Sequence, residues 1–203
     1  MCGGDFTVMK TKNVLAVLVT SAALLMVGNA MAQWNLLLFE SSPESYVGHN
    51  GQTFDIGSPE YVFTDNSGPN GIGDFILTIH TPDWSSVWGL EFATADGTDF
   101  QSGTTYAGAQ RAPFQEPGHP GLGLYGDSRG YNASSGWFKV LDFERLNGMV
   151  THAEIQFYQH GDDFHGTRES WESGTLSYSV PEPATCALVG VSLAAMLIFR
   201  RRY

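Results

Sequence analysis

The chain has 203 residues and carries 10 Lys and Arg against 21 Asp and Glu, which gives a formal net charge of −11. Half of the basic residues lie in the two terminal segments, whereas only Asp5 and Glu182 among the acids lie outside residues 33–180. Because the middle of the chain is so acidic, we expect no nucleic-acid partner and no anionic lipid surface for it, and cations, neutral sugars or basic surfaces suit it better.

The N-terminal segment has the three parts of a secretory signal peptide in the usual order. Two lysines precede an apolar run over residues 14–27, and a small-x-small cleavage site follows. The run is short for a membrane span, and a buried N-terminal helix is the alternative. We predict a signal peptide over residues 1–32, with Met9 as an alternative start, that signal peptidase removes. The residues at the predicted cleavage site are Ala30, Ala32 and Gln33.

Residues 33–180 form one predicted domain of ordinary size. Both cysteines, Cys2 and Cys186, lie outside it, so the domain folds without a disulfide. Turns rich in Gly and Pro separate short segments in which apolar side chains alternate, as they do in strands. These segments are NLLLFE (35–40), EYVFTD (60–65), GDFILTIH (73–80), VWGLEFA (87–93), GWFKVLDFER (136–145), THAEIQFYQH (151–160) and TLSYSV (175–180).

This pattern predicts an all-β domain, specifically an antiparallel β-sandwich of the jelly-roll kind, since many short strands occur without a β–α alternation. Within the fifth segment we expect Trp137, Leu141 and Phe143 on one face of the strand and Phe138 and Val140 on the other. The domain is expected to be flanked by the N-terminal signal helix and by a C-terminal transmembrane helix.

The C-terminal segment begins with a Pro-Glu-Pro triplet at residues 181–183. An apolar run over residues 184–199 and three arginines follow. The run is at the short edge of what spans a bilayer, and the positive-inside rule holds the arginines in the cytoplasm. An ordinary anchor behind a Pro-containing linker is the alternative. Together, the triplet, the run and the arginines over residues 181–203 resemble the PEP-CTERM sorting signal of Gram-negative bacteria.

The PEP-CTERM resemblance implies how the chain is handled. It implies export, an anchor in the membrane through the C-terminal segment, and processing by exosortase near the triplet. The mature protein would then belong to the cell surface or the extracellular matrix, in association with exopolysaccharide or biofilm. The residues of the predicted sorting signal are Pro181, Glu182, Pro183, Arg200, Arg201 and Arg202.

Three stretches of the predicted domain carry a second resemblance. FESSPESYVGHNG, PFQEPGHPGLGLYGDSRGYN and FYQHGDD resemble a family of small secreted bacterial all-β domains without an established activity. Where that family's pattern has two cysteines, this chain has Tyr131 and Gly161. If those cysteines pair in relatives, a large residue facing a missing side chain could fill the same space here. The family's Gly-Asp pair is replaced by Glu44 and Ser45.

Two tryptophans in polar surroundings are the predicted sugar-binding residues. Trp84 lies in PDWSS and Trp171 in ESWES, and an exposed indole on a β-rich frame can stack on a sugar ring. Burial in the core is the alternative for most of the five tryptophans, since Trp is highly buried on average.

Clusters of His and Asp could hold a cation, but turns explain them better. QHGDDFHG matches no standard metal motif. Asp-Gly loops can bind Ca²⁺, but the EF-hand pattern is absent and an ordinary turn is favoured, so we expect no cofactor and no bound metal. Arg129 is expected to pair with a nearby carboxylate. The residues considered for a cation are His160, Asp162, Asp163, His165, Asp96, Asp99 and Asp127.

The sequence carries no nucleophile motif and no phosphate-binding loop, so we expect a non-catalytic protein. The leading interpretation is an exported structural or interaction protein sorted by exosortase. A carbohydrate- or Ca²⁺-binding module is the first alternative. An enzyme that acts on extracellular polysaccharide is the second.

Overall fold

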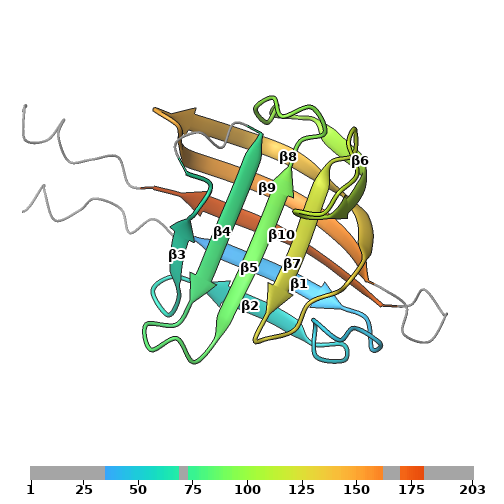
Figure 1. Ribbon diagram of the computed structural model, residues 1–203. Helices are drawn as coiled ribbons and strands as arrows, with labels where there is room; N and C mark the ends of the chain where they lie inside the picture. Colours follow the sequence, from blue (N-terminus) through green and yellow to red (C-terminus); the bar gives the residue numbers. More distant parts are fainter. Residues whose placement is uncertain (1–34, 69–72, 162–169, 181–203) are drawn as a thin grey trace, which may run out of the picture. The chain divides into compact units, whose positions relative to one another are not determined.

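A computed structural model of the chain describes residues 35–68, 73–161 and 170–180. Ten strands account for most of these residues, and Figure 1 shows their arrangement. Within the described residues there is no helix that is long and apolar enough to cross a membrane. The strands are β1 (Leu36–Ser41), β2 (Thr53–Gly57), β3 (Val62–Asp65), β4 (Asp74–His80), β5 (Val87–Ala93), β6 (Thr105–Arg111), β7 (Gly121–Gly126), β8 (Ser134–Leu146), β9 (Met149–Gly161) and β10 (Trp171–Ser179).

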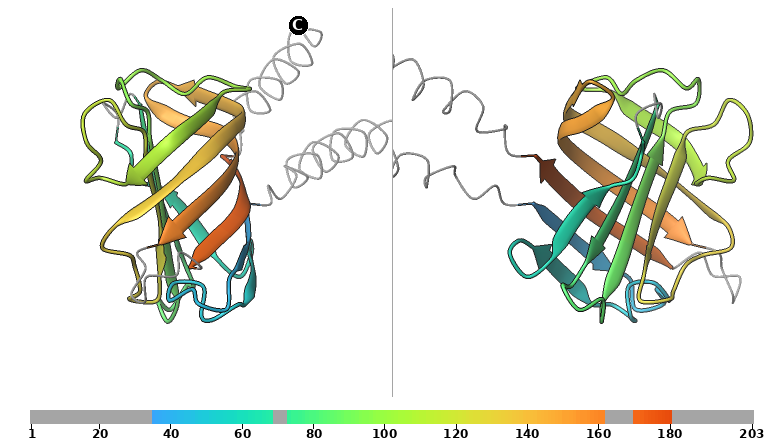
Figure 2. Two further views of the ribbon diagram at one scale, coloured as in Figure 1. Left: turned by 90° about the vertical axis from the view of Figure 1, so that its right-hand side faces the viewer. Right: turned by 60° about the vertical axis from the view of Figure 1, so that its left-hand side comes forward.

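The ten strands belong to one sheet, in the order β2-β1-β10-β9-β8-β6-β7-β5-β4-β3. Every neighbouring pair is antiparallel except β6 and β7, which are parallel and pair at only two positions. The sheet curls into a half-barrel, so that β4, β5 and β7 face β8, β9, β10 and β1 across the core (Figures 1 and 2).

The predicted all-β class is therefore confirmed for the described residues, whereas the antiparallel jelly-roll sandwich is wrong. A sandwich has two separate sheets, but here the short parallel link between β6 and β7 joins the two halves. Register shifts in β6, β8 and β9 bend the long strands around the core. The predicted signal helix and transmembrane helix fall outside the described residues.

The core lies on the inner face of the curled sheet, where alternate side chains of each strand point. Phe75, Leu77 and Ile79 of β4 are completely buried, and β5 contributes Trp88, Leu90 and Phe92. Each such side chain contributes roughly 2 kcal/mol through the burial of its apolar surface.

The predicted face of Phe143 is wrong, because a bulge in β8 changes the alternation of inward and outward side chains. Phe138 and Val140 are buried and Trp137 faces outward, so these residues lie on opposite faces, as predicted. The register shifts between Val140 and Asp142, so Phe143 returns to the inner face and packs against the core. An irregularity of one residue is enough to reverse the side of every later side chain.

The two ends of the described domain lie next to each other. Leu36 in β1 is opposite Ser177 in β10. The Asn35 side-chain oxygen accepts the Ser179 N–H at 2.7 Å, and the Val180 N–H donates to the Thr151 carbonyl at 2.9 Å. The chain is thus held in regular hydrogen bonding up to the residue before the Pro-Glu-Pro triplet.

Candidate functional site

Three aromatic rings form a row across β8, β9 and β10 on the outer face of the sheet. Trp137 is opposite Tyr158, and their ring centroids are 6.5 Å apart with planes 11° from parallel. Tyr158 and Trp171 follow with 6.1 Å and 21°. Trp137 is 37% exposed and the other two rings are half-buried. We call Trp137, Tyr158 and Trp171 the aromatic row.

Polar side chains surround the aromatic row because the outer face of these strands is the polar face. Ser173 is opposite Tyr158 on one side and Glu40 on the other. Lys139 in β8 and Gln156 in β9 are opposite each other, two residues along from Trp137 and Tyr158. Such a surface offers flat apolar rings beside hydrogen-bonding groups, which is the combination that the faces and hydroxyl groups of a sugar require.

Trp84 lies in the turn between β4 and β5, with 60% of its surface exposed. Its ring stacks on His80, with centroids 3.6 Å apart and planes 11° from parallel. Its backbone has a positive φ of 60°, and its N–H donates to the Thr81 carbonyl, which holds the turn. The two predicted sugar-binding tryptophans therefore stack on different partners, and the structure does not join them in one ring stack.

A pocket of about 630 Å³ opens where β6 and β7 separate. Beyond Leu122, β7 has no partner among the described strands on the β6 side. The side-chain amide of Gln159 in β9 takes that place: its oxygen accepts the Leu124 N–H at 2.7 Å and its nitrogen donates to the Leu124 carbonyl at 3.1 Å. Gln159 and Leu124 thus form part of the wall of the pocket, which we call the β7 pocket.

Two carboxylates in the β7 pocket are engaged by their neighbours. Glu91 accepts a hydrogen bond from the Tyr125 hydroxyl at 3.0 Å. Burial, and then the Glu91 charge, raise the pKa of Tyr125 to about 12. Asp127 accepts the Val87 N–H at 2.9 Å and the Ser86 hydroxyl at 3.0 Å, so it holds the turn after β7. Turn chemistry, rather than a cation, accounts for this aspartate.

Two guanidinium groups line the same pocket. Arg111 donates to the Asn132 carbonyl at 3.0 Å and lies over the Phe114 ring, with the guanidinium carbon 4.6 Å from the centroid. Arg129 lies over the Tyr46 ring at 5.7 Å. The prediction that Arg129 pairs with a carboxylate is wrong, because both ion pairs among the described residues belong to other side chains, Arg145 and His152.

A buried carboxylate lies behind the β7 pocket. Glu172 in β10 is completely buried, and it accepts hydrogen bonds from the Tyr131 hydroxyl at 2.6 Å and from the Ser45 hydroxyl. Gln159 is 3.5 Å from its other oxygen. Burial raises the pKa of Glu172, although these hydrogen bonds oppose the shift. Burial, and then the Glu172 charge, raise the pKa of Tyr131 to about 12.

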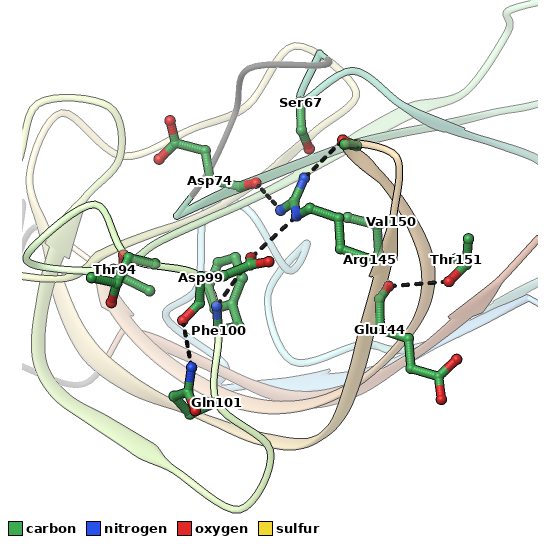
Figure 3. Close-up of polar contacts among 12 residues, drawn as sticks. Ser67, Asp74, Thr94, Asp99, Phe100, Gln101, Glu144, Arg145, Val150 and Thr151 are labelled. Carbon is green, nitrogen blue, oxygen red and sulfur yellow. Dashed lines mark hydrogen bonds and ion pairs between the residues drawn. The ribbon is translucent and has the colours of Figure 1, made fainter.

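The other aspartates considered for Ca²⁺ have structural partners. Asp96 accepts both the N–H and the hydroxyl of Thr98, as in an ordinary turn. Asp99 accepts the Arg145 Nε–H at 3.1 Å, and Arg145 also donates to the Asp74 and Gly148 carbonyls (Figure 3). The described residues contain no group of three or more His, Cys, Asp or Glu side chains that could hold a metal ion. Asp162, Asp163 and His165 lie outside them.

Comparison with known proteins decides one feature of the chain. Residues 179–202 match the PEP-CTERM protein-sorting motif. The match begins at the last residue of β10 and contains the predicted sorting residues, which lie outside the described residues, as do Ala30, Ala32 and Gln33. The PEP-CTERM motif implies export, a C-terminal membrane anchor before processing, and processing by exosortase. No curated protein and no solved structure matches the chain.

Sequence reasoning found part of this site. It singled out Trp171, but it grouped Trp137 only with Leu141 and Phe143 and did not join the three rings. It considered Arg129 and Asp127 in a loop without seeing a pocket. Both residues line the β7 pocket, which forms where the short parallel pairing of β6 and β7 ends. The sequence carries no periodic pattern that predicts this pairing.

Proposed function

We propose that this PEP-CTERM protein is a non-catalytic extracellular protein that associates with exopolysaccharide, and that its domain contacts neutral polysaccharide through the aromatic row. The PEP-CTERM motif supports the extracellular part of this proposal. The single observation that supports the sugar contact is the outward-facing stack of Trp137, Tyr158 and Trp171.

Two features of the aromatic row favour a polymer over a protein partner. Its rings cross three neighbouring strands and so extend along the surface instead of forming one deep apolar site. Ser173, Gln156 and Glu40 supply donors and acceptors beside the rings. An apolar protein interface would instead exclude such groups from its centre. The acidity of residues 33–180 favours a neutral polymer.

The direct test is binding of the full chain to immobilised neutral glucans, in a polyoxyethylene detergent that carries no sugar. We expect Trp137→Ala and Trp171→Ala each to weaken binding about fivefold or more, because each removes one stacking surface. Leu38→Ala is the matched control, since Leu38 is an exposed apolar residue on the same outer face, and it should change binding less than twofold. An unchanged affinity in the Trp137→Ala, Trp171→Ala double variant would refute the proposal.

The same assay separates the remaining alternatives. Trp84→Ala tests the second predicted sugar contact, and a loss as large as that of Trp171→Ala would make the β4–β5 turn part of the binding surface. Repeating the assay with Ca²⁺ and then with a chelator tests the Ca²⁺-binding alternative. Binding that disappears with the chelator would require a cation at the domain.

The non-catalytic part of the proposal has its own test. The carboxylates of the β7 pocket are engaged, Glu91 with Tyr125 and Asp127 with the turn after β7, which is the arrangement of structural side chains. We expect no new reducing ends when glucans are incubated with the full chain. Reducing ends that appear with the natural chain and fail to appear with Glu91→Gln would instead establish an enzyme.

A further inference from the structure

The β7 pocket is a second surface with the features of a ligand site. Its volume of about 630 Å³ is within the range of small-molecule sites. No residue of the aromatic row lines it. Gly123 lies on its wall, and a Cβ there would meet nothing closer than 3.6 Å. The absence of a side chain at this position is therefore not required by the packing, and it leaves the pocket open.

The β7 pocket carries two guanidinium groups. Residues 33–180 contain five basic side chains, and two of them, Arg111 and Arg129, line the pocket. Their guanidinium groups lie over the aromatic rings of Phe114 and Tyr46. Among the described residues, Arg111 donates one hydrogen bond, toward a backbone carbonyl, so most of the five N–H groups of each fork remain for a ligand. A guanidinium fork matches the geometry of a carboxylate.

The remaining lining residues suit a hydroxylated ring rather than a bare anion. Phe114, which is 70% exposed, and Tyr125 supply apolar surface. Glu91 and Asp127 each use one carboxylate oxygen in the hydrogen bonds described above. Their second oxygens can accept hydroxyl groups, whereas they would repel a small anion that has no hydroxyl to donate.

We propose that the β7 pocket binds a sugar acid, with the carboxylate of one uronic acid residue held by Arg111 and Arg129 and its hydroxyl groups held by Glu91 and Asp127. The proposal extends the proposed function to a second, acidic class of polysaccharide, and it does not depend on the aromatic row.

The test is calorimetric titration of the full chain, in the same sugar-free detergent, with an oligogalacturonate and with the same oligosaccharide after reduction of its carboxyl groups. We expect binding of the acidic form and at least a tenfold weaker affinity for the reduced form. Arg111→Gln and Arg129→Gln should each weaken oligogalacturonate binding about tenfold. Lys139→Gln is the matched control, because it removes the same charge from the outer face, and it should change the affinity less than twofold.

A second variant keeps the test decisive if an arginine variant unfolds. Gly123→Ala has room at its Cβ and narrows the pocket, so we expect a folded protein that binds oligogalacturonate more weakly. Equal affinity for the reduced oligosaccharide, or an equal loss in Lys139→Gln, would overturn the proposal. Displacement by inorganic phosphate at equal concentration would also overturn it, because the site would then hold any oxyanion. Trp137→Ala should leave this affinity unchanged, which distinguishes failure here from failure of the aromatic row.

Discussion

The ring of Tyr131 occupies the space that a side chain at Gly161 would need. A Cβ at position 161 would lie 2.2 Å from Tyr131 Cε1 and 2.3 Å from its Cζ. The two positions are thus adjacent, as the comparison with the cysteine-containing family pattern predicted, and the large residue faces the missing side chain.

The first prediction follows from this contact. Gly161→Ala should lower the free energy of unfolding by about 1–3 kcal/mol, because the Tyr131 ring cannot move aside without losing its hydrogen bond to Glu172. Urea denaturation of the full chain measures the change. Gly123→Ala is the control, since its Cβ has ordinary space, and a loss as large as that of Gly161→Ala would show that strand glycines are generally sensitive here.

The second prediction concerns the cysteines of the resembled family. In a chain that carries Cys2→Ser and Cys186→Ser, we expect the pair Tyr131→Cys and Gly161→Cys to form a disulfide under mild oxidation, since the two positions are in contact. Titration of free thiols with and without reductant measures it. Two free thiols in the oxidised, folded protein would contradict the idea that Tyr131 and Gly161 replace a bridge.

The third prediction is the pH dependence that Glu172 contributes. Its pKa in the folded state is raised above 4.5, so the folded state binds more protons than the unfolded state above that pH. The contribution of Glu172 to stability is thus complete below about pH 4.5 and is lost as the pH rises through the raised pKa. Glu172→Gln keeps an uncharged side chain at this place and should become steadily more stable relative to the natural chain as the pH increases.

Thermal unfolding of both proteins between pH 4 and pH 8 measures this difference. Tyr131→Phe provides a further check, because it removes a hydrogen bond that lowers the pKa of Glu172 and should extend the loss of stability to higher pH. A difference between the natural chain and Glu172→Gln that stays constant with pH would rule out a proton uptake by Glu172.

The fourth prediction concerns Gln159, whose side-chain amide bonds the backbone of Leu124 where β7 lacks a neighbour among the described strands. Gln159→Leu removes both hydrogen bonds to Leu124 and leaves its N–H and carbonyl without these partners, which should cost about 2–4 kcal/mol. Guanidinium denaturation measures the cost. Gln156→Leu is the matched control, because Gln156 lies in the same strand on the exposed outer face, and its effect should stay within about 0.5 kcal/mol.

The fifth prediction concerns Arg145, whose guanidinium joins three chain segments. Arg145→Lys keeps the charge but cannot reach Asp99, Asp74 and Gly148 at once, so we expect a loss of about 1–3 kcal/mol. Lys139→Arg on the outer face is the control and should be neutral. An equally neutral Arg145→Lys would mean that the charge alone matters in this cluster.

The alternating segments were the part of the fold that the sequence predicted well. Strands β4 and β9 bury the apolar side chains of one face, so these residues recur at every second position. Strand β7 reads GLGLYG, in which glycine hides the alternation, and β2 and β6 are short of apolar residues. These three were not predicted, and without β6 and β7 the parallel link that makes one sheet could not be inferred.

The candidate sites were harder to predict, because their members meet only through register and loops. Glu172, Ser45 and Tyr131 come from three separate parts of the chain and give no local motif. The aromatic row requires that Trp137 lie opposite Tyr158, which depends on the strand pairing of β8 and β9. Single aromatic residues in polar surroundings, such as Trp171, are what a sequence can indicate.

The pairing of the first and last strands has a mechanical consequence. Leu36 lies opposite Ser177, at the ends of β1 and β10. A force that separates the two ends of the domain therefore acts across the β1–β10 hydrogen bonds and breaks them one after another. A force between the C-terminal end and a ligand held elsewhere on the domain acts along β10 and loads its hydrogen bonds to β1 and β9 at the same time. Under the proposed function, a domain anchored by its C-terminal segment and bound to a polymer through the aromatic row is therefore pulled in the direction in which the sheet resists best.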